Sequence, residues 1–110
     1  MRVLEVACVN ERQRSPTFRR VLNKLFRMYE DKGYRARSSG ILDGRQLSAE
    51  DVDRAYRVIA VDGMVANSLV KRFGLEPPKL IQLSIPDIYE RDSPALIARV
   101  ERFYLSDAWK

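Results

Sequence analysis

The chain has 110 residues, a single cysteine, no histidine and a formal net charge of +5. This length fits one domain, residues 1–110, built around one hydrophobic core. The composition excludes histidine-based catalysis, a histidine-ligated metal site, a disulfide within the chain and a cysteine-rich zinc site.

The first predicted element is a short strand that ends at Cys8. Its apolar residues are Val3, Leu4, Val6 and Ala7. Ser15 and Pro16 then predict the start of a helix, with Ser15 as its N-cap and Pro16 as its first residue. The residues between form a short loop above a helix N-terminus. Inward-facing backbone N–H groups in such a loop, together with the helix dipole, favour a bound anion.

This loop carries Cys8 and Arg14 with five residues between them. A thiol at a helix N-terminus beside an arginine reacts as a thiolate, and the planar guanidinium of Arg14 can hold two phosphoryl oxygens at once. The hydroxyl of Ser15 is placed to donate to the sulfur. The predicted phosphate-binding residues are Val9, Asn10, Glu11, Arg12, Gln13 and Arg14. The alternative is a buried structural cysteine, but then the coincidence of spacing and helix-start signals has no explanation.

Helices and strands alternate through the rest of the chain. Apolar residues at helical spacing predict a first helix over about 16–31, with Gly33 as its C-cap. The later elements are a strand over 34–38, a short helix capped by Ser48, a strand over 56–61, a helix over 64–73 ended by Gly74, a strand over 79–84 and a last helix from Ser93-Pro94. Four such repeats imply a parallel sheet with right-handed crossovers.

Ligands of such sheets bind beyond the C-terminal ends of the strands. Cys8 and Asp87 follow two of the predicted strands, so both should lie at this edge. Glu5 falls within the first strand, where it should be buried. Because a buried carboxylate needs a partner, we expect an arginine beside it or a face of the sheet that solvent reaches.

The order of cysteine, five residues, arginine, serine and proline resembles the signature of the low-molecular-weight protein tyrosine phosphatases. It stands here as Cys8, Arg14, Ser15 and Pro16, between a strand and a helix. The segment Ile-Pro-Asp-Ile-Tyr at 85–89 resembles that of small microbial predicted phosphatases. The resemblance covers the whole chain. It implies an α/β fold with a four-stranded parallel sheet in the order 2-1-3-4, flanked by helices.

The resemblance also implies catalytic roles for Cys8, Arg14, Ser15 and Asp87, with Asp87 as the general acid and Tyr89 lining the substrate site. Here the proline precedes the aspartate, whereas the better-known members have it after. Asp92 is the competing acid, although Asp92-Ser93-Pro94 is predicted to cap the last helix.

The loop departs from the family pattern in one respect. The asparagine stands two places after the cysteine instead of three, and Glu11 occupies the third place. Because a carboxylate facing a phosphate would oppose its binding, the side chain of Glu11 is expected to point outward.

These features predict a cysteine-dependent phosphomonoester hydrolase, with a protein tyrosine phosphatase as the favoured interpretation. The expected substrate is a phosphotyrosine-containing protein or a small aryl phosphate, and phosphate or another oxyanion should bind in the loop. No metal or organic cofactor is required. Two alternatives stay open: a catalytically impaired pseudophosphatase that binds phosphorylated partners, and a phosphocysteine carrier. A carrier has no need of the phosphate-clamping Arg14.

The positive charge and the hydropathy pattern set expectations about partners. Lys and Arg residues are dispersed among acidic ones, without a basic run or interleaved aromatic residues, so nucleic-acid binding is not favoured. No segment is long and apolar enough to span a membrane, and no signal-peptide pattern begins the chain. The expected location is therefore the cytoplasm.

Overall fold

A four-stranded parallel sheet in the order β2-β1-β3-β4 organises the chain, which confirms the predicted strand order. The computed structural model describes residues 1–110. The strands are β1 (Arg2–Cys8), β2 (Tyr34–Gly40), β3 (Ala55–Ala60) and β4 (Leu80–Gln82); the helices are α1 (Arg14–Met28), α2 (Ala49–Arg54), α3 (Gly63–Phe73) and α4 (Pro94–Leu105). Strands and helices alternate as expected of an α/β fold.

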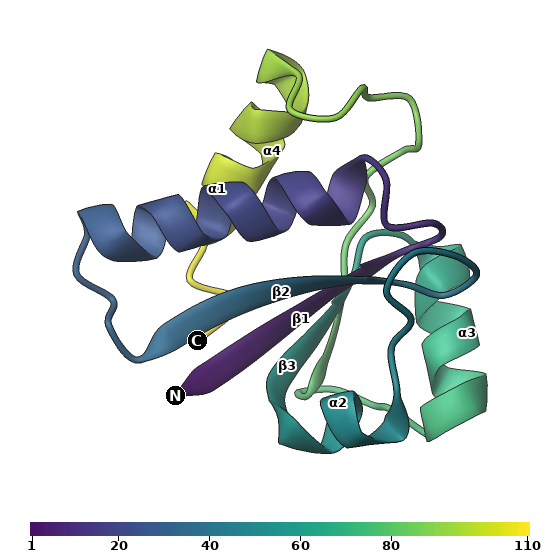
Figure 1. Cartoon of the computed structure of the whole chain (residues 1–110). Coiled ribbons are helices and arrows are strands. Elements are labelled where there is room, and N and C mark those ends of the chain that lie inside the picture. Colours follow the sequence, from purple (N-terminus) through teal and green to yellow (C-terminus); the bar gives the residue numbers. More distant parts are fainter.

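Helices cover both faces of the sheet (Figure 1). The pair α1 and α4 packs on one face, and α2 and α3 lie on the other. Because β1 is central and covered on both sides, its residues from Leu4 to Cys8 are all buried. The face of α1 toward the sheet buries Phe18, Val21, Leu22, Leu25 and Phe26, at the spacing expected of an amphipathic helix. No helix is both long and apolar enough to cross a bilayer.

Helix α1 begins earlier than predicted. Its N-cap is Gln13, which makes no capping bond with its side chain, and the helix starts at Arg14. Ser15 is therefore not the N-cap, because its hydroxyl contacts the sulfur of Cys8 instead. The prediction of Ser15 as a cap is wrong, while the predicted contact with the cysteine is observed.

Helix α1 also ends earlier than predicted. Its C-cap is Tyr29, and Glu30 takes the left-handed conformation that follows, with φ of 58°. Gly33 is therefore not the C-cap. A non-glycine residue supplies the turn, so the glycine signal three residues later misplaces the end of the helix.

The other helix ends follow the sequence signals. Ser48 and Asp51 form a reciprocal capping box on α2, and Gly74 ends α3 in the left-handed conformation. The hydroxyl of Ser93 accepts a hydrogen bond from the Leu96 N–H at the start of α4. Ser93, and not the preceding aspartate, is thus the cap of the last helix.

The N-terminal ends of the strands adjoin an aromatic cluster. Its members are Phe26, Tyr34, Tyr56, Tyr104 and Trp109. Trp109 is fully buried, and its indole N–H donates to the Tyr104 carbonyl at 2.8 Å. Its ring meets Tyr34 edge-on with the ring centres 4.7 Å apart. Aromatic packing thereby anchors the C-terminal segment at the N-terminal ends of the strands.

Candidate active site

The strands bring Cys8 to the C-terminal edge of the sheet, at the end of β1. Its side chain is 3% exposed, and its sulfur lies 2.9 Å from the hydroxyl oxygen of Ser15 in the first turn of α1. The same hydroxyl donates to the carbonyl of Ser39 in β2 at 3.3 Å. The thiol therefore sits at the junction of a strand, a loop and a helix N-terminus, with a hydroxyl in direct contact.

Arg14 is buried, with only 2% of its side chain exposed. Its Nη1 atom donates to Oδ2 of Asp62 at 2.6 Å and to the carbonyl of Ile85 at 2.8 Å. Its Nε atom lies 3.7 Å from Oδ1 of Asp87. A buried cation needs an anionic partner, which Asp62 and Asp87 supply here. The guanidinium is fixed on the Nη1 side and makes no hydrogen bond within the protein through Nη2.

Asp62 is a residue of the site that the sequence analysis missed. It is the second residue after the buried end of β3 and is the N-cap of α3, where it accepts from the Val65 N–H at 2.9 Å. Partial burial raises the pKa of its carboxyl, but the hydrogen bonds from Val65 and Arg14 outweigh burial and leave the pKa below its ordinary value. Asp62 is therefore held ionised against the arginine. The sequence signal for this residue was an aspartate directly after the predicted strand over 56–61, at the edge of a parallel sheet where ligands bind.

The loop between β1 and α1 has unused donors. None of the backbone N–H groups of residues 9–15 donates a hydrogen bond within the protein. Glu11 holds this loop in shape with φ of 52°, a left-handed conformation that glycine or asparagine adopts more readily. A loop of free N–H groups before a helix N-terminus can accept an anion.

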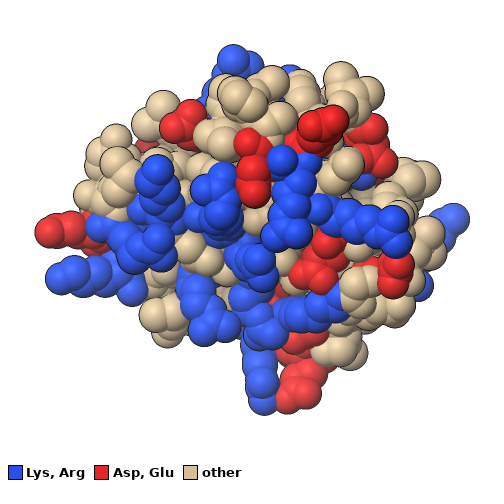
Figure 2. All heavy atoms as spheres, turned by 45° about the horizontal axis from the view of Figure 1, so that its top comes forward, with Lys and Arg blue, Asp and Glu red and all other residues tan.

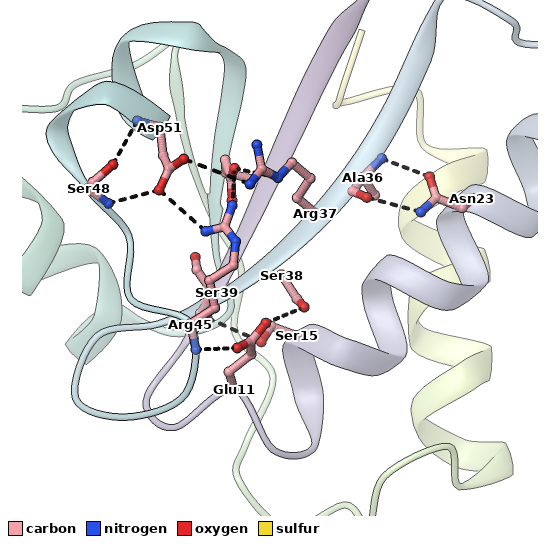
Figure 3. Close-up of polar contacts among 11 residues, drawn as sticks. Glu11, Ser15, Asn23, Ala36, Arg37, Ser38, Ser39, Arg45, Ser48 and Asp51 are labelled. Carbon is pink, nitrogen blue, oxygen red and sulfur yellow. Dashed lines mark hydrogen bonds and ion pairs between the residues drawn. The ribbon is translucent and has the colours of Figure 1, made fainter.

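The side chain of Glu11, predicted to point outward from a bound phosphate, makes two hydrogen bonds with neighbouring segments. Its Oε2 accepts from the hydroxyl of Ser38 in β2 at 2.6 Å, and its Oε1 accepts from the Arg45 N–H at 2.6 Å (Figure 3). These two short hydrogen bonds satisfy the carboxylate of Glu11 beside the sheet. The glutamate fastens the loop to the neighbouring strand and to the connection after it.

The connection after β2 packs closely on the same loop. The N–H of Ile41 lies 3.0 Å from the carbonyl oxygens of both Cys8 and Val9. Gly44 has φ of 76°, and a Cβ atom there would lie 2.7 Å from the Cβ of Glu11. This approach requires glycine. The connection thus braces the loop from the β2 side.

The two candidate acids have different surroundings. Asp87 is 65% exposed and lies beside Arg14, in the segment that follows β4. The Asp92 carboxylate accepts from the hydroxyl of Thr17 at 3.1 Å and from Nε of Arg20 at 3.0 Å. Desolvation opposes its ionisation, but these two bonds keep its pKa below the ordinary value. Asp92 thus connects α1 to the start of α4. The Asp87 side chain makes no hydrogen bond within the protein and lies near Arg14 at the edge of the site.

Tyr89 lies in the same segment as Asp87. It is half-buried and packs against the hydrophobic core. The predicted contact of Tyr89 with substrate is not tested by this packing and stays a prediction.

Glu5 has the arginine partners that the sequence suggested. Its side chain is 1% exposed, and Oε1 lies 2.9 Å from Nη2 of Arg45 and 3.5 Å from Nε of Arg37. Both arginines also reach Asp51 of α2 (Figure 3). Burial raises the pKa of Glu5, and the two arginines only partly offset this effect. Oε2 of Glu5 has no hydrogen-bond partner. The structure contains no group of three acidic or thiol side chains suited to a metal ion.

Solved structures with the same fold include three proteins, two of which are named as phosphatases. The low-molecular-weight phosphotyrosine phosphatase of Vibrio cholerae matches with a TM-score of 0.77, 18% identity, and coverage of 99% of this chain and 97% of that one. YfkJ of Bacillus subtilis has a TM-score of 0.78, 18% identity, and coverage of 96% and 94%. The YwlE arginine phosphatase of Geobacillus stearothermophilus has a TM-score of 0.71, 18% identity, and coverage of 99% and 88%.

No protein-family model and no curated protein matches the sequence. The likeness to the solved structures extends over nearly the whole chain, although few residues are identical. It shows that the chain has the fold of the low-molecular-weight protein tyrosine phosphatases, as its resemblance to that family predicted.

Proposed function

We propose that this protein is a cysteine-dependent phosphomonoester hydrolase in which Cys8 is the nucleophile. The observation that carries the proposal is the arrangement around the thiol. Cys8 lies at the end of β1 in contact with Ser15, which follows the buried Arg14 in the chain, and it begins a loop whose backbone N–H groups have no acceptor in the protein. These groups are the donors that a phosphoryl dianion requires.

In the first step the Cys8 thiolate attacks phosphorus in line with the ester oxygen. An S–P bond forms while the P–O bond to the leaving group breaks. Arg14 and the loop N–H groups would stabilise the charge on the equatorial oxygens. Asp62 keeps the Nη1 side of the guanidinium fixed, which leaves its other nitrogens for the phosphoryl group.

Asp87 protonates the departing oxygen. In the second step it accepts a proton from water as the water attacks phosphorus and the S–P bond breaks, releasing phosphate and restoring the thiolate. The distance of 3.7 Å between its Oδ1 and Nε of Arg14 supports this role, because it keeps the exposed carboxyl close to the arginine. The Ser15 hydroxyl, which donates to Ser39 in the structure, would turn its hydrogen toward the sulfur to stabilise it both as nucleophile and as leaving group.

The proposed substrate is a phosphotyrosine-containing protein or a small aryl phosphate. The buried sulfur supports this choice, because a long side chain reaches the bottom of a deep loop more easily than a short one. A phosphoarginine side chain is also long, and one solved structure with this fold is named an arginine phosphatase. Phosphoarginine is therefore the second substrate class to be measured.

The test compares the wild-type protein with Cys8→Ser on para-nitrophenyl phosphate, a phosphotyrosine peptide and a phosphoarginine peptide, all with EDTA present. We expect hydrolysis by the wild type and none by the variant. Acid-quenched wild type should carry phosphate on Cys8 during turnover. Binding without turnover would instead identify a pseudophosphatase. A stable phosphocysteine that passes its phosphate to another acceptor would identify a carrier.

A further inference from the structure

A groove lined by arginines runs along the free edge of the sheet, next to the phosphate-binding loop. Its volume is about 380 Å³, and it lies between α1, β2 and the connection after β2. Its lining includes Glu11, Arg19, Asn23, Arg35, Arg37 and Arg45. Glu11 belongs to both the groove and the loop, so a molecule bound at the loop could extend directly into the groove.

The four arginines of the groove differ in their partners. Arg37 and Arg45 are bound to Glu5 beneath them and to Asp51. Arg19 and Arg35 are exposed, and neither makes an ion pair in the structure. The inner pair therefore has counterions within the protein, while the outer pair presents two guanidinium groups to an external anion.

The basic surface continues past the groove. A second hollow of about 500 Å³ shares Asn23 and Arg35 with the groove and is also lined by Arg27 and Lys32. Figure 2, with the α1 side of the molecule turned forward, shows Lys and Arg atoms gathered over this side. The lining of both hollows includes only three acidic residues, so the path is predominantly cationic along its length.

The edge of β2 does not favour pairing with another strand. The side chain of Asn23 donates to the Ala36 carbonyl at 3.0 Å and accepts from the Ala36 N–H at 2.8 Å (Figure 3). The N–H and carbonyl groups of Ala36, near the midpoint of β2, are therefore already hydrogen-bonded within the protein. A ligand in the groove would be recognised through the arginine side chains and not by addition of a strand.

We propose that this groove binds an acidic segment of the phosphorylated protein substrate, beside the phosphorylated residue. The inference rests on the proposed function and adds a substrate class to it. Guanidinium groups bind carboxylates through paired hydrogen bonds, and the two outer arginines are free to do so. Glu11 in the groove and Glu30 and Asp31 in the second hollow interrupt the positive charge. Such mixed charge suits an acidic peptide better than the regular phosphates of a nucleic acid.

The test uses two phosphotyrosine peptides of one sequence, with several glutamates or the same number of glutamines flanking the phosphotyrosine on both sides. The wild type should have a higher kcat/KM for the glutamate peptide. Arg19→Gln with Arg35→Gln should lower this preference about threefold to tenfold, since each exposed pair contributes little. The preference should shrink with added salt. Hydrolysis of para-nitrophenyl phosphate, which is too small to enter the groove, should not change.

The matched control is Lys71→Gln with Arg72→Gln, which removes the same charge from the exposed end of α3. It should keep the preference for the glutamate peptide. Equal loss of the preference in both double variants, or no preference in the wild type, would overturn the proposal.

If no ester is hydrolysed, the proposed function fails and the groove is tested by binding alone. Fluorescence anisotropy of a labelled, unphosphorylated glutamate peptide should then show weaker binding to the Arg19/Arg35 variant than to the control. Equal binding to both variants would overturn the groove as well. Binding of single-stranded RNA that requires Arg19 and Arg35, without binding of the glutamate peptide, would also overturn it.

Discussion

The two edges of this sheet are built from different chemistry. At the C-terminal edge Cys8, Arg14 and Asp62 meet a loop whose N–H groups have no acceptor in the protein. At the N-terminal edge Tyr34 and Trp109 pack edge-on, and the indole N–H is satisfied by a backbone carbonyl. One edge keeps binding groups unpaired, while the other is filled and satisfied. Groups that can bind a ligand and groups that stabilise the fold are therefore separated along the strands.

The polar edge carries unsatisfied groups that the aromatic edge lacks. The hydroxyl of Ser39, opposite Ala7 near the loop, and Oε2 of Glu5, at the middle of β1, are buried without a hydrogen-bond partner. Unpaired buried polar groups cost stability. The aromatic edge has no such group and supplies packing that offsets this cost. Substitutions at the two edges should therefore separate activity from stability.

The largest effect is expected at the polar edge. Asp87→Asn should slow hydrolysis of esters with poor leaving groups by about 10²–10⁴-fold, because the proposed general acid is lost. Acidic phenols, which depart without a proton, should be affected much less. The thermal midpoint should stay close to that of the wild type, since Asp87 is mostly exposed. Loss of turnover in Asp92→Asn, with Asp87→Asn active, would assign the acid to Asp92.

The matching change at the aromatic edge is Trp109→Ala. It should lower the free energy of unfolding by about 3–5 kcal/mol, the cost of truncating a fully buried aromatic side chain. The kcat of the protein that remains folded should be unchanged. Urea unfolding and active-site titration measure the two quantities separately. A loss of kcat in fully folded protein would show that the two edges are coupled.

Asp62→Asn tests stability within the polar edge. Asparagine can still cap α3 but loses the charge that faces Arg14, so we expect a loss of about 1–3 kcal/mol of stability near neutral pH. Because the pKa of Asp62 is lowered in the folded state, its contribution is present above the ordinary aspartate pKa and disappears as the pH falls through the lower folded value. The difference in thermal midpoint should therefore vanish in acid. A difference that is constant from pH 7 to pH 2 would contradict this assignment.

The smallest effect is expected where α4 begins. Ser93→Ala removes the hydroxyl that accepts from the Leu96 N–H and should cost about 1 kcal/mol. Catalysis should not change, because Ser93 contacts none of the proposed catalytic residues. Denaturant titration beside para-nitrophenyl phosphate kinetics checks both expectations. Ser93→Thr is the control that keeps a capping hydroxyl.

The sequence predicted the parts of the fold that depend on local signals. The capping pair Ser48 and Asp51 and the helix stop at Gly74 were legible because each acts within a few residues. Ser15 was misassigned because its hydroxyl contacts Cys8, a partner that only the folded chain brings near. Gly33 misled because Glu30 supplies the left-handed turn after α1.

The candidate site was predictable to the same extent. The spacing of Cys8 and Arg14 identified the loop from the sequence. The orienting contact of Asp62 and the two hydrogen bonds of Glu11 join residues far apart in the chain. They arise from the order of the strands, which the resemblance supplied, and from side-chain positions, which no sequence pattern specifies.

The contact between Cys8 and Ser15 has a consequence for oxidation. The neighbour of the sulfur is a hydroxyl, and the chain holds no second thiol. Peroxide converts a thiolate first to a sulfenic acid, which a nearby cysteine could trap as a disulfide. Here that sulfenic acid must meet an external thiol or a backbone nitrogen, or proceed to irreversible acids. Damage to this molecule would therefore be reversed only by early encounter with an external reductant, so the lifetime of the proposed activity under peroxide depends on the thiols around the protein.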